Sequence, residues 1–396
     1  AGRCAEALTF SEPDLAEAAQ ANHDDLAEWR YLRANCLRQL GDLAAAVTEY
    51  DRLVETSPGS PFSPAARYER LVTMFRAGLH ERVLREAPGV TPPEQFQDDL
   101  LWLQAESAEA LKDSARATQH YRLLLEHHPE SPLAPDAAYR LGYQLQRREL
   151  WAEASSVYLD LAKRFPDHAL TPQALFASGL CLAREDRDEE ALRDWHALLT
   201  RFPDHASVPE TLFQKAMVET RLDAGRDAAV TLDELLRRFP QYERLAEARF
   251  WRAQHFYGDG ETAAAERLLR AAIDTHLPSE IEREAFFLLG LILQADGRDA
   301  EAAAAFQPLL EAPIRAKFTP ERLLWLSEFQ FARGAWQAAE DAARSLLASA
   351  ISDDWRQAAW MLKARTLRAR EQRSEAMAAL HKALETKAFT RFGAEA

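Results

Sequence analysis

Apolar positions recur along this chain with a period of 37 residues. Repeating units can be aligned with first residues at Ala27, Pro64, Asp98, Pro135, Pro172, Pro209, Ala246, Arg283, Pro320 and Gln357. Only the step from Pro64 to Asp98 is shorter, at 34 residues. The twentieth position is alanine in nine of these ten units. An internal period of this length is typical of a solenoid, in which each unit packs only against its neighbours.

The spacing of small and large residues predicts two helices in every unit. The eighth position is small in nine of the ten units, with Leu71 as the exception. Small residues at the eighth and twentieth positions allow two helices to cross closely. A polar break such as residues 40–42 separates the helices, and large apolar residues such as Tyr158 and Leu161 then return at helical spacing. A proline such as Pro166 ends the second helix.

The order of a small residue, alanine, an aromatic residue and proline resembles the tetratricopeptide repeat over residues 27–388. This resemblance implies an all-α fold, an α-solenoid that winds into a right-handed superhelix of about ten helix-turn-helix repeats. Unit two departs from the pattern, because Ala87 stands where the aromatic residue belongs. We expect residues 1–26 to form an N-terminal helical cap or half repeat, and residues 389–396 to form a C-terminal tail.

The linkers at residues 164–168 and 201–205 both read RFPDH. They resemble the linkers of bacterial envelope members of the family, the BamD-like and CpoB-like repeat proteins. This resemblance implies a periplasmic location, and the cytoplasm stays open as the alternative.

The three cysteines do not predict a disulfide framework. Cys36 and Cys181 share the tenth position of units four repeats apart, too far for a bridge, and we expect both to be small core residues. Cys4 follows Arg3 and not the small residue that precedes a lipidated cysteine, so a lipid anchor is not expected there.

Composition and motifs argue against several functions. A net charge of −15, from 48 basic and 63 acidic residues, disfavours binding to nucleic acid. No apolar run is long enough to span a membrane. We find no nucleotide-binding, zinc or nucleophile motif, so we expect no enzyme activity and no cofactor. His127 and His128 are adjacent, a spacing that suits a helix C-terminus better than a metal site.

The resemblance places the first helices on a concave face, with positions 2, 5, 9, 12 and 13 directed inward. The fifth position is aromatic in eight consecutive units. These rings either wedge between neighbouring helices or also form the floor of a peptide groove. Arginines at position 13 could add a basic track for acidic peptides or a C-terminal carboxylate. The residues expected to bind a partner are Tyr139, Tyr143, Arg147, Phe176, Arg184, Phe213, Met217, Arg221, Phe250 and Phe287.

We therefore expect a non-enzymatic scaffold that binds a peptide segment or a protein partner, in a bacterial envelope assembly. One alternative is the helical, substrate-guiding portion of a cell-wall hydrolase of the lytic transglycosylase kind. Another is a purely architectural subunit, and apolar ends of the array also leave self-association open. A carboxylate clamp for chaperone tails is not supported, because only Asn35 matches it.

Overall fold

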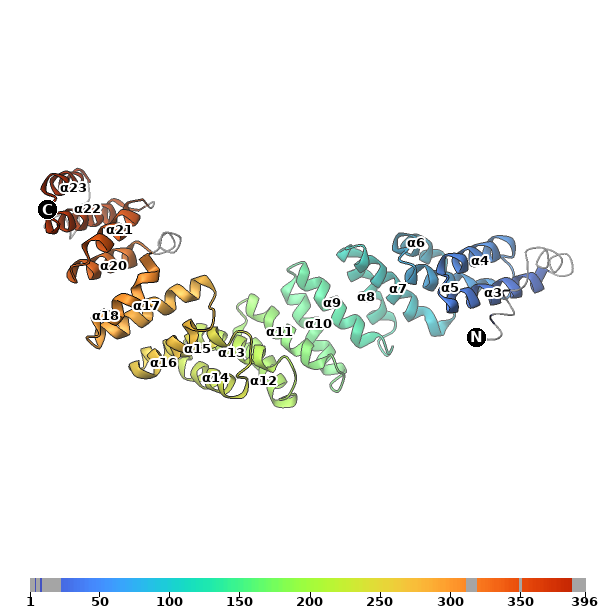
Figure 1. Ribbon diagram of the computed structural model, residues 1–396. Helices are drawn as coiled ribbons and strands as arrows, with labels where there is room; N and C mark the ends of the chain where they lie inside the picture. Colours follow the sequence, from blue (N-terminus) through green and yellow to red (C-terminus); the bar gives the residue numbers. More distant parts are fainter. Residues whose placement is uncertain (1–3, 5–7, 9–22, 311–318, 349–350, 387–396) are drawn as a thin grey trace. The chain divides into compact units, whose positions relative to one another are not determined.

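The computed structural model describes residues 4, 8, 23–310, 319–348 and 351–386. Every regular element among these residues is a helix, as Figure 1 shows. The α-helices are α3 (His23–Leu40), α4 (Leu43–Thr56), α5 (Ser63–Arg76), α6 (His80–Glu86), α7 (Gln97–Ala110), α8 (Ser114–His127), α9 (Ala134–Arg147), α10 (Trp151–Arg164), α11 (Thr171–Arg184), α12 (Asp188–Arg201), α13 (Val208–Arg221), α14 (Gly225–Arg238), α15 (Leu245–Gly258), α16 (Thr262–Ile273), α17 (Ser279–Ala295), α18 (Asp299–Phe306), α20 (Pro320–Ala332), α21 (Trp336–Leu347), α22 (Asp353–Ala369) and α23 (Arg373–Glu385). Short 3₁₀ turns occupy Ala87–Gly89, Glu94–Phe96 and Gln307–Leu310.

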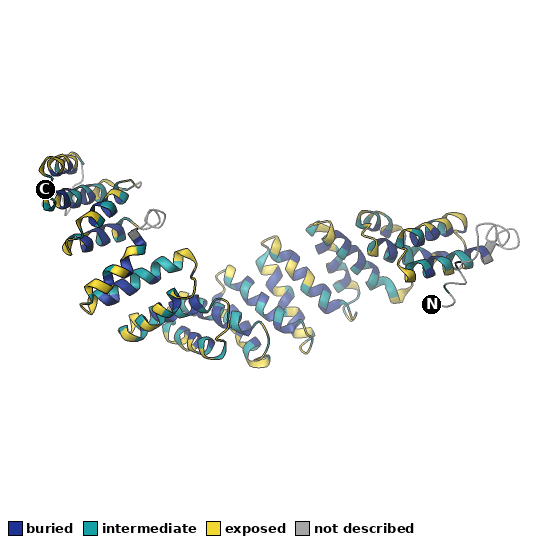
Figure 2. Ribbon diagram, in the orientation of Figure 1, coloured by how far each residue is buried: buried dark blue, intermediate teal, exposed yellow. Residues whose placement is uncertain are grey.

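The helices form two compact halves, residues 1–218 and 219–396, with the boundary inside α13. We call them the N-terminal half and the C-terminal half. Within each half, consecutive helices pair as hairpins, and each helix turns one buried stripe toward its neighbours (Figure 2). This arrangement confirms the predicted all-α architecture of stacked helical hairpins. Most of the expected N-terminal cap, residues 1–26, and the whole expected tail, residues 389–396, lie outside the described residues.

Close packing inside a repeat unit depends on the residues at positions 8 and 24. Gly179 lies against the Trp195 indole, and a Cβ added to this glycine would be 2.2 Å from Nε1 of the ring. A Cβ added to Gly142 would likewise lie 2.5 Å from the ring of Tyr158. Real carbon atoms do not approach so closely, so these glycines are required by the large rings that cover them.

In unit two, the large side chain stands at position 8 and the small one at position 24, the reverse of most other units. Leu71 occupies position 8 and Ala87 occupies position 24, and both are buried in one apolar cluster. The large residue has moved from the second helix to the first, so the departure from the repeat pattern is compensated within the unit.

The turn between the two helices places position 15 in the left-handed region in every unit. The φ angles run from 56° to 89° at Gly41, Gly78, Lys112, Glu149, Asp186, Asp223, Gly260, Gly297, Gly334 and Glu371. Five of these residues carry a side chain, although the left-handed region strongly favours glycine.

We therefore expect Glu149→Gly to raise the free energy of unfolding by about 0.5–1 kcal/mol, because it relieves a backbone cost without removing a buried contact. The adjacent Arg148 has φ −96°, so Arg148→Gly is the matched control and should lower stability instead. Urea denaturation followed by circular dichroism measures both changes. Equal effects of the two substitutions would contradict the backbone explanation.

The RFPDH linkers join successive units through their arginines. Nη2 of Arg164 donates to the carbonyl oxygen of Pro129 at 2.8 Å, and Nη2 of Arg201 donates to that of Pro166 at 2.9 Å. The two guanidinium groups also lie 5.2 and 5.1 Å from the ring centroids of the phenylalanines that follow them. The arginine of the motif therefore has a structural role, because it donates a hydrogen bond to a backbone carbonyl at the end of the preceding unit.

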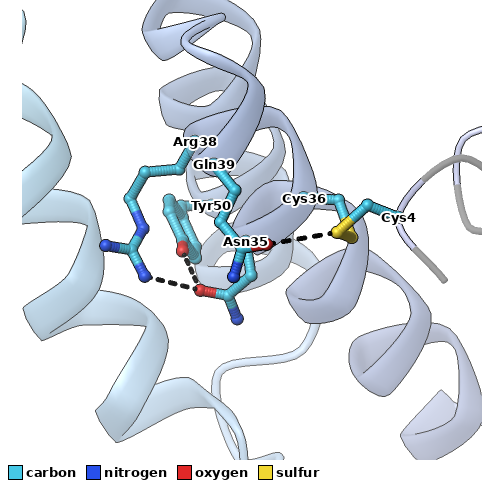
Figure 3. Close-up of a disulfide and its surroundings, with 6 residues drawn as sticks. All are labelled: Cys4, Asn35, Cys36, Arg38, Gln39 and Tyr50. Carbon is cyan, nitrogen blue, oxygen red and sulfur yellow. Dashed lines mark hydrogen bonds between the residues drawn. A yellow bond between two sulfur atoms is a disulfide. The ribbon is translucent and has the colours of Figure 1, made fainter. Parts of the chain in front are cut away.

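The structure corrects the prediction for the cysteines. Cys36, on α3, forms a disulfide with Cys4, and their Cα atoms are 5.0 Å apart (Figure 3). Repeat spacing relates Cys36 to Cys181 but carries no information about Cys4, which precedes the first repeat unit. Cys181 is a buried free thiol, as expected, and burial raises its pKa to about 12.

Candidate partner-binding surface

The expected concave face corresponds to positions 2, 5, 9, 12 and 13 of the first helices, which we call the first-helix face. In the N-terminal half, α9 supplies Tyr139, Tyr143 and Arg147, and α11 supplies Phe176 and Arg184. Tyr143 is 44% exposed, and Arg147 and Arg184 are exposed in the last turns of their helices. Within the described residues, no ion pair involves either arginine, so both guanidinium groups can reach a ligand.

Four of the fifth-position rings lie against the ring at position 24 of their own unit. The ring centroids of Tyr139 and Tyr158 are 5.5 Å apart, and burial raises the pKa of Tyr139. Phe213 and Phe250 are each only 2% exposed. Their rings therefore offer almost no surface for a groove floor, whereas Tyr139 and Phe176 keep partial exposure.

The three arginines that were expected to form one basic track do not all belong to the same half of the molecule. Arg147 and Arg184 belong to the N-terminal half, whereas Arg221, at the end of α13, belongs to the C-terminal half. Met217, which is partly exposed, lies on the same helix as Arg221 but within the N-terminal half. The candidate surface of the N-terminal half is therefore the pair Arg147 and Arg184 together with Tyr143.

Acidic residues of the first-helix face are engaged in a network at units three and four. The Tyr121 hydroxyl lies 2.5 Å from Oε1 of Glu106 and 2.9 Å from Oε2 of Glu109. Nη1 of Arg140 donates to Glu109 at 3.1 Å. These carboxylates already have partners and neutralise Arg140, whereas no ion pair among the described residues engages Arg147 or Arg184.

Asn35, which alone matched a chaperone-tail clamp, is also engaged within its own unit. Its Oδ1 accepts hydrogen bonds from the Tyr50 hydroxyl at 2.9 Å and from Nη2 of Arg38 at 3.2 Å (Figure 3). The amide oxygen is therefore committed to packing between α3 and α4.

The C-terminal half has a pocket of about 310 Å³ on its first-helix face. Its apolar lining includes Phe287 and Leu291 from α17 and Tyr257 from α15, and Tyr257 is 40% exposed. Arg322, on α20, pairs with Glu284 and lies 5.0 Å from the centroid of the Phe287 ring. A pocket with an apolar lining and a guanidinium at its edge can hold an apolar side chain beside a polar group.

Of the residues that line this pocket, Phe287 was among those expected from the sequence to bind a partner, whereas Tyr257 and Arg322 were not. Tyr257 stands at position 12, one of the positions expected to face inward, so it could have been included among the candidate residues from the sequence alone. Arg322 stands at position 3 of its unit, outside the expected set. Its place at the pocket depends on how two neighbouring units stack, which the repeat period does not specify.

His127 ends α8 and His128 caps it, which confirms the helix C-terminus interpretation. No group of three His, Cys, Asp or Glu residues suited to a metal ion occurs among the described residues. None of the described helices is both long and apolar enough to cross a membrane.

Comparison with known proteins identifies the repeat. Models of the tetratricopeptide repeat match residues 11–61, 139–206 and 252–317, and a further one matches residues 99–131. No curated protein matches the chain. The C-terminal part of a tetratricopeptide repeat-containing protein from Cytophaga hutchinsonii is 15% identical with a TM-score of 0.50, covering 65% of this chain and 98% of that one.

A tetratricopeptide repeat protein from Parabacteroides merdae is 17% identical with a TM-score of 0.42, covering 68% of this chain and 98% of that one. Likeness at these identities concerns the fold alone. The family matches cover more than half of the residues. The chain therefore belongs to the tetratricopeptide repeat family.

Proposed function

We propose that this protein is a non-enzymatic scaffold that binds a peptide segment or a protein partner on its first-helix face. Tetratricopeptide repeats generally serve protein–protein interaction, which gives the class of function. The observation that carries the finer proposal is the exposure of Arg147 and Arg184, at position 13 of two consecutive units, together with the exposed Tyr143 on α9.

The chemistry of this pair suits an extended acidic segment or a C-terminal carboxylate. Guanidinium groups form two-pronged hydrogen bonds with carboxylates, and an exposed tyrosine adds apolar contact with one polar end. Both arginines stand at position 13 of consecutive units, so they recur with the repeat. A rigid helical array loses little conformational freedom on binding, which favours recognition of a flexible segment.

We further propose that the protein works in the bacterial envelope, in an oxidising compartment such as the periplasm. The disulfide between Cys4 and Cys36 supports this location, because such bonds persist in oxidising compartments and are rare in reducing ones. The RFPDH linkers, with their resemblance to envelope members of the family, support it independently.

The test is capture of partners from envelope and cytosolic extracts by the native chain and by Arg147→Glu/Arg184→Glu. The control is Arg226→Glu/Arg267→Glu, which makes the same charge change at exposed positions of second helices α14 and α16. Circular dichroism verifies folding of both variants. We expect a captured protein to be lost only with the first variant, by roughly tenfold or more. Equal capture by all three proteins would contradict the proposed surface.

A further inference from the structure

A cavity of about 340 Å³ lies in the N-terminal half, away from the residues of the first-helix face. It is formed by α10, α11 and α12, and its lining includes Ser155, Leu159, Ser178 and Leu182. The carboxylate of Asp194, on α12, also lines this cavity. The volume falls within the lower part of the range of ligand pockets, roughly 300–1,000 Å³.

Asp194 is an unusual residue for the inner side of a second helix. It is only 9% exposed, and its Oδ2 accepts a hydrogen bond from the Ser178 hydroxyl at 2.6 Å. Within the described part of the chain, no ion pair involves this carboxylate. Burial raises its pKa, opposed by the Ser178 hydrogen bond. A buried carboxylate that forms no ion pair is costly, and a bound cation would offset that cost.

Unit two has an arginine–glutamate ion pair at the positions that Ser178 and Asp194 occupy in unit five. Ser178 stands at position 7 of its unit and Asp194 at position 23, and the same positions of unit two hold Arg70 and Glu86. Nη2 of Arg70 lies 2.8 Å from Oε2 of Glu86. The other arm of the guanidinium, Nη1, lies 2.9 Å from Oδ1 of Asp51 on the preceding second helix.

A second arginine at position 7 behaves similarly. Arg252 of unit seven binds Asp233, at position 25 of the preceding unit, through two hydrogen bonds of 2.8 and 3.0 Å. The residue at position 25 of unit four, which precedes unit five, is Leu159, and it lines the cavity. An arginine at position 7 therefore occupies the space between consecutive second helices.

Unit five keeps the acid of this arrangement but not its arginine. With Ser178 at position 7, the guanidinium is missing, and a cavity lies between the residues that would surround it. We propose that this cavity binds a guanidinium group of a ligand, which pairs with Asp194 in the place that an internal arginine takes in unit two. The inference does not depend on the proposed first-helix surface.

Arg187, Glu190 and Arg193 also line the cavity, and their charges are balanced enough to admit a cation. Arg187 is paired with Glu190 at 2.8 Å and with Glu185 at 3.6 Å, and Arg193 is paired with Glu190 at 3.8 Å. Arg193 and Lys163 act on the Asp194 carboxylate from a distance and favour its charged form. The two arginines of the lining thus have acidic partners of their own, whereas the Asp194 carboxylate accepts a hydrogen bond from the Ser178 hydroxyl.

The probes are N-acetyl-arginine amide and N-acetyl-citrulline amide, which replaces the guanidinium by a neutral urea of nearly the same shape. Binding is followed by methyl NMR of the full chain, at Leu159 and Leu182. We expect saturable shifts of these methyl groups with the arginine probe and at least roughly tenfold weaker binding of the citrulline probe. Equal binding of both probes, or no saturable shift, would overturn the proposal.

Two variants assign the binding to Asp194. Asp194→Asn keeps the shape and the Ser178 hydrogen-bond acceptor, and should abolish the preference for the arginine probe. Ser178→Arg should fill the cavity from inside, raise the melting temperature and remove binding. Asp160→Asn, an exposed carboxylate on α10, makes the same charge change as the first variant and should leave binding intact. If Ser178→Arg fails to fold, comparison of Asp194→Asn with its control Asp160→Asn still decides whether Asp194 binds the probe. Unchanged binding of the arginine probe to Asp194→Asn would refute the site.

A third probe identifies the source of the guanidinium. An acetylated and amidated Gly-Arg-Gly peptide that binds more tightly than the arginine amide would indicate an arginine of a partner protein. Equal affinity of the two would indicate a small guanidinium compound. Both results support the cavity as a guanidinium site and differ only in the source of the group that they indicate.

Discussion

Replacement of Gly179 by alanine is expected to lower the free energy of unfolding by about 2–3 kcal/mol. The added Cβ would lie 2.2 Å from Nε1 of Trp195, so the indole has to move. That nitrogen also donates a hydrogen bond to the carbonyl oxygen of Phe176 at 3.2 Å, which the movement would weaken. Urea denaturation, with hydrogen exchange of α11 and α12, measures the loss.

Gly258→Ala is the matched control, because Gly258 is also helical and a Cβ added there meets nothing within 4 Å. This variant should be unchanged or more stable by up to about 1 kcal/mol, since alanine favours helix. A double variant, Gly179→Ala with Trp195→Leu, should lose less stability than the sum of its two single changes. Additive losses would contradict the packing explanation.

Loss of the disulfide is expected to destabilise the N-terminal hairpin by about 3–4 kcal/mol, the loop-closure estimate for a 32-residue separation. The test variant is Cys36→Ser, and hydrogen exchange of α3 and α4 should rise while that of α15–α17 stays constant. In a solenoid each repeat is stabilised by contacts with its immediate neighbours alone, so the loss of stability should stay near the first repeat.

Titration of free thiols provides the control for this prediction. Oxidised protein, denatured without reductant, should show one thiol, from Cys181, and three after reduction. Reductant should have no further effect on the stability of a Cys4→Ser/Cys36→Ser variant. Three thiols before reduction would contradict the disulfide.

The helical hairpins could be predicted from the sequence, because their packing is local and repeats with the period. The small residue at position 8 indicated a close crossing, and Gly142 and Gly179 show its cause in the rings that cover them. The exchange of a small for a large residue at Leu71 and of a large for a small one at Ala87 could also be predicted from the sequence, since both positions were already aligned.

Features that depend on the stacking of units could not be predicted in this way. The pairing of Arg322 with Glu284 joins two units, and its geometry follows from their relative rotation. Burial of Phe213 and Phe250 also depends on neighbouring side chains, so one aromatic column contains both buried rings and partly exposed rings. Cys4 lies outside the repeats, and its return to Cys36 has no periodic signal.

Site-specific photo-crosslinking tests the proposed binding surface most directly. A photoreactive phenylalanine derivative is placed at Tyr143 or Tyr257, on the first-helix faces of the two halves, and at Val230, which is 69% exposed on second helix α14. Crosslinking is performed in bacterial envelope extracts. We predict discrete protein adducts at Tyr143 or Tyr257 and none at Val230, with the Tyr143 adduct removed by Arg147→Glu/Arg184→Glu. Adducts at Val230 alone would contradict binding on the first-helix face.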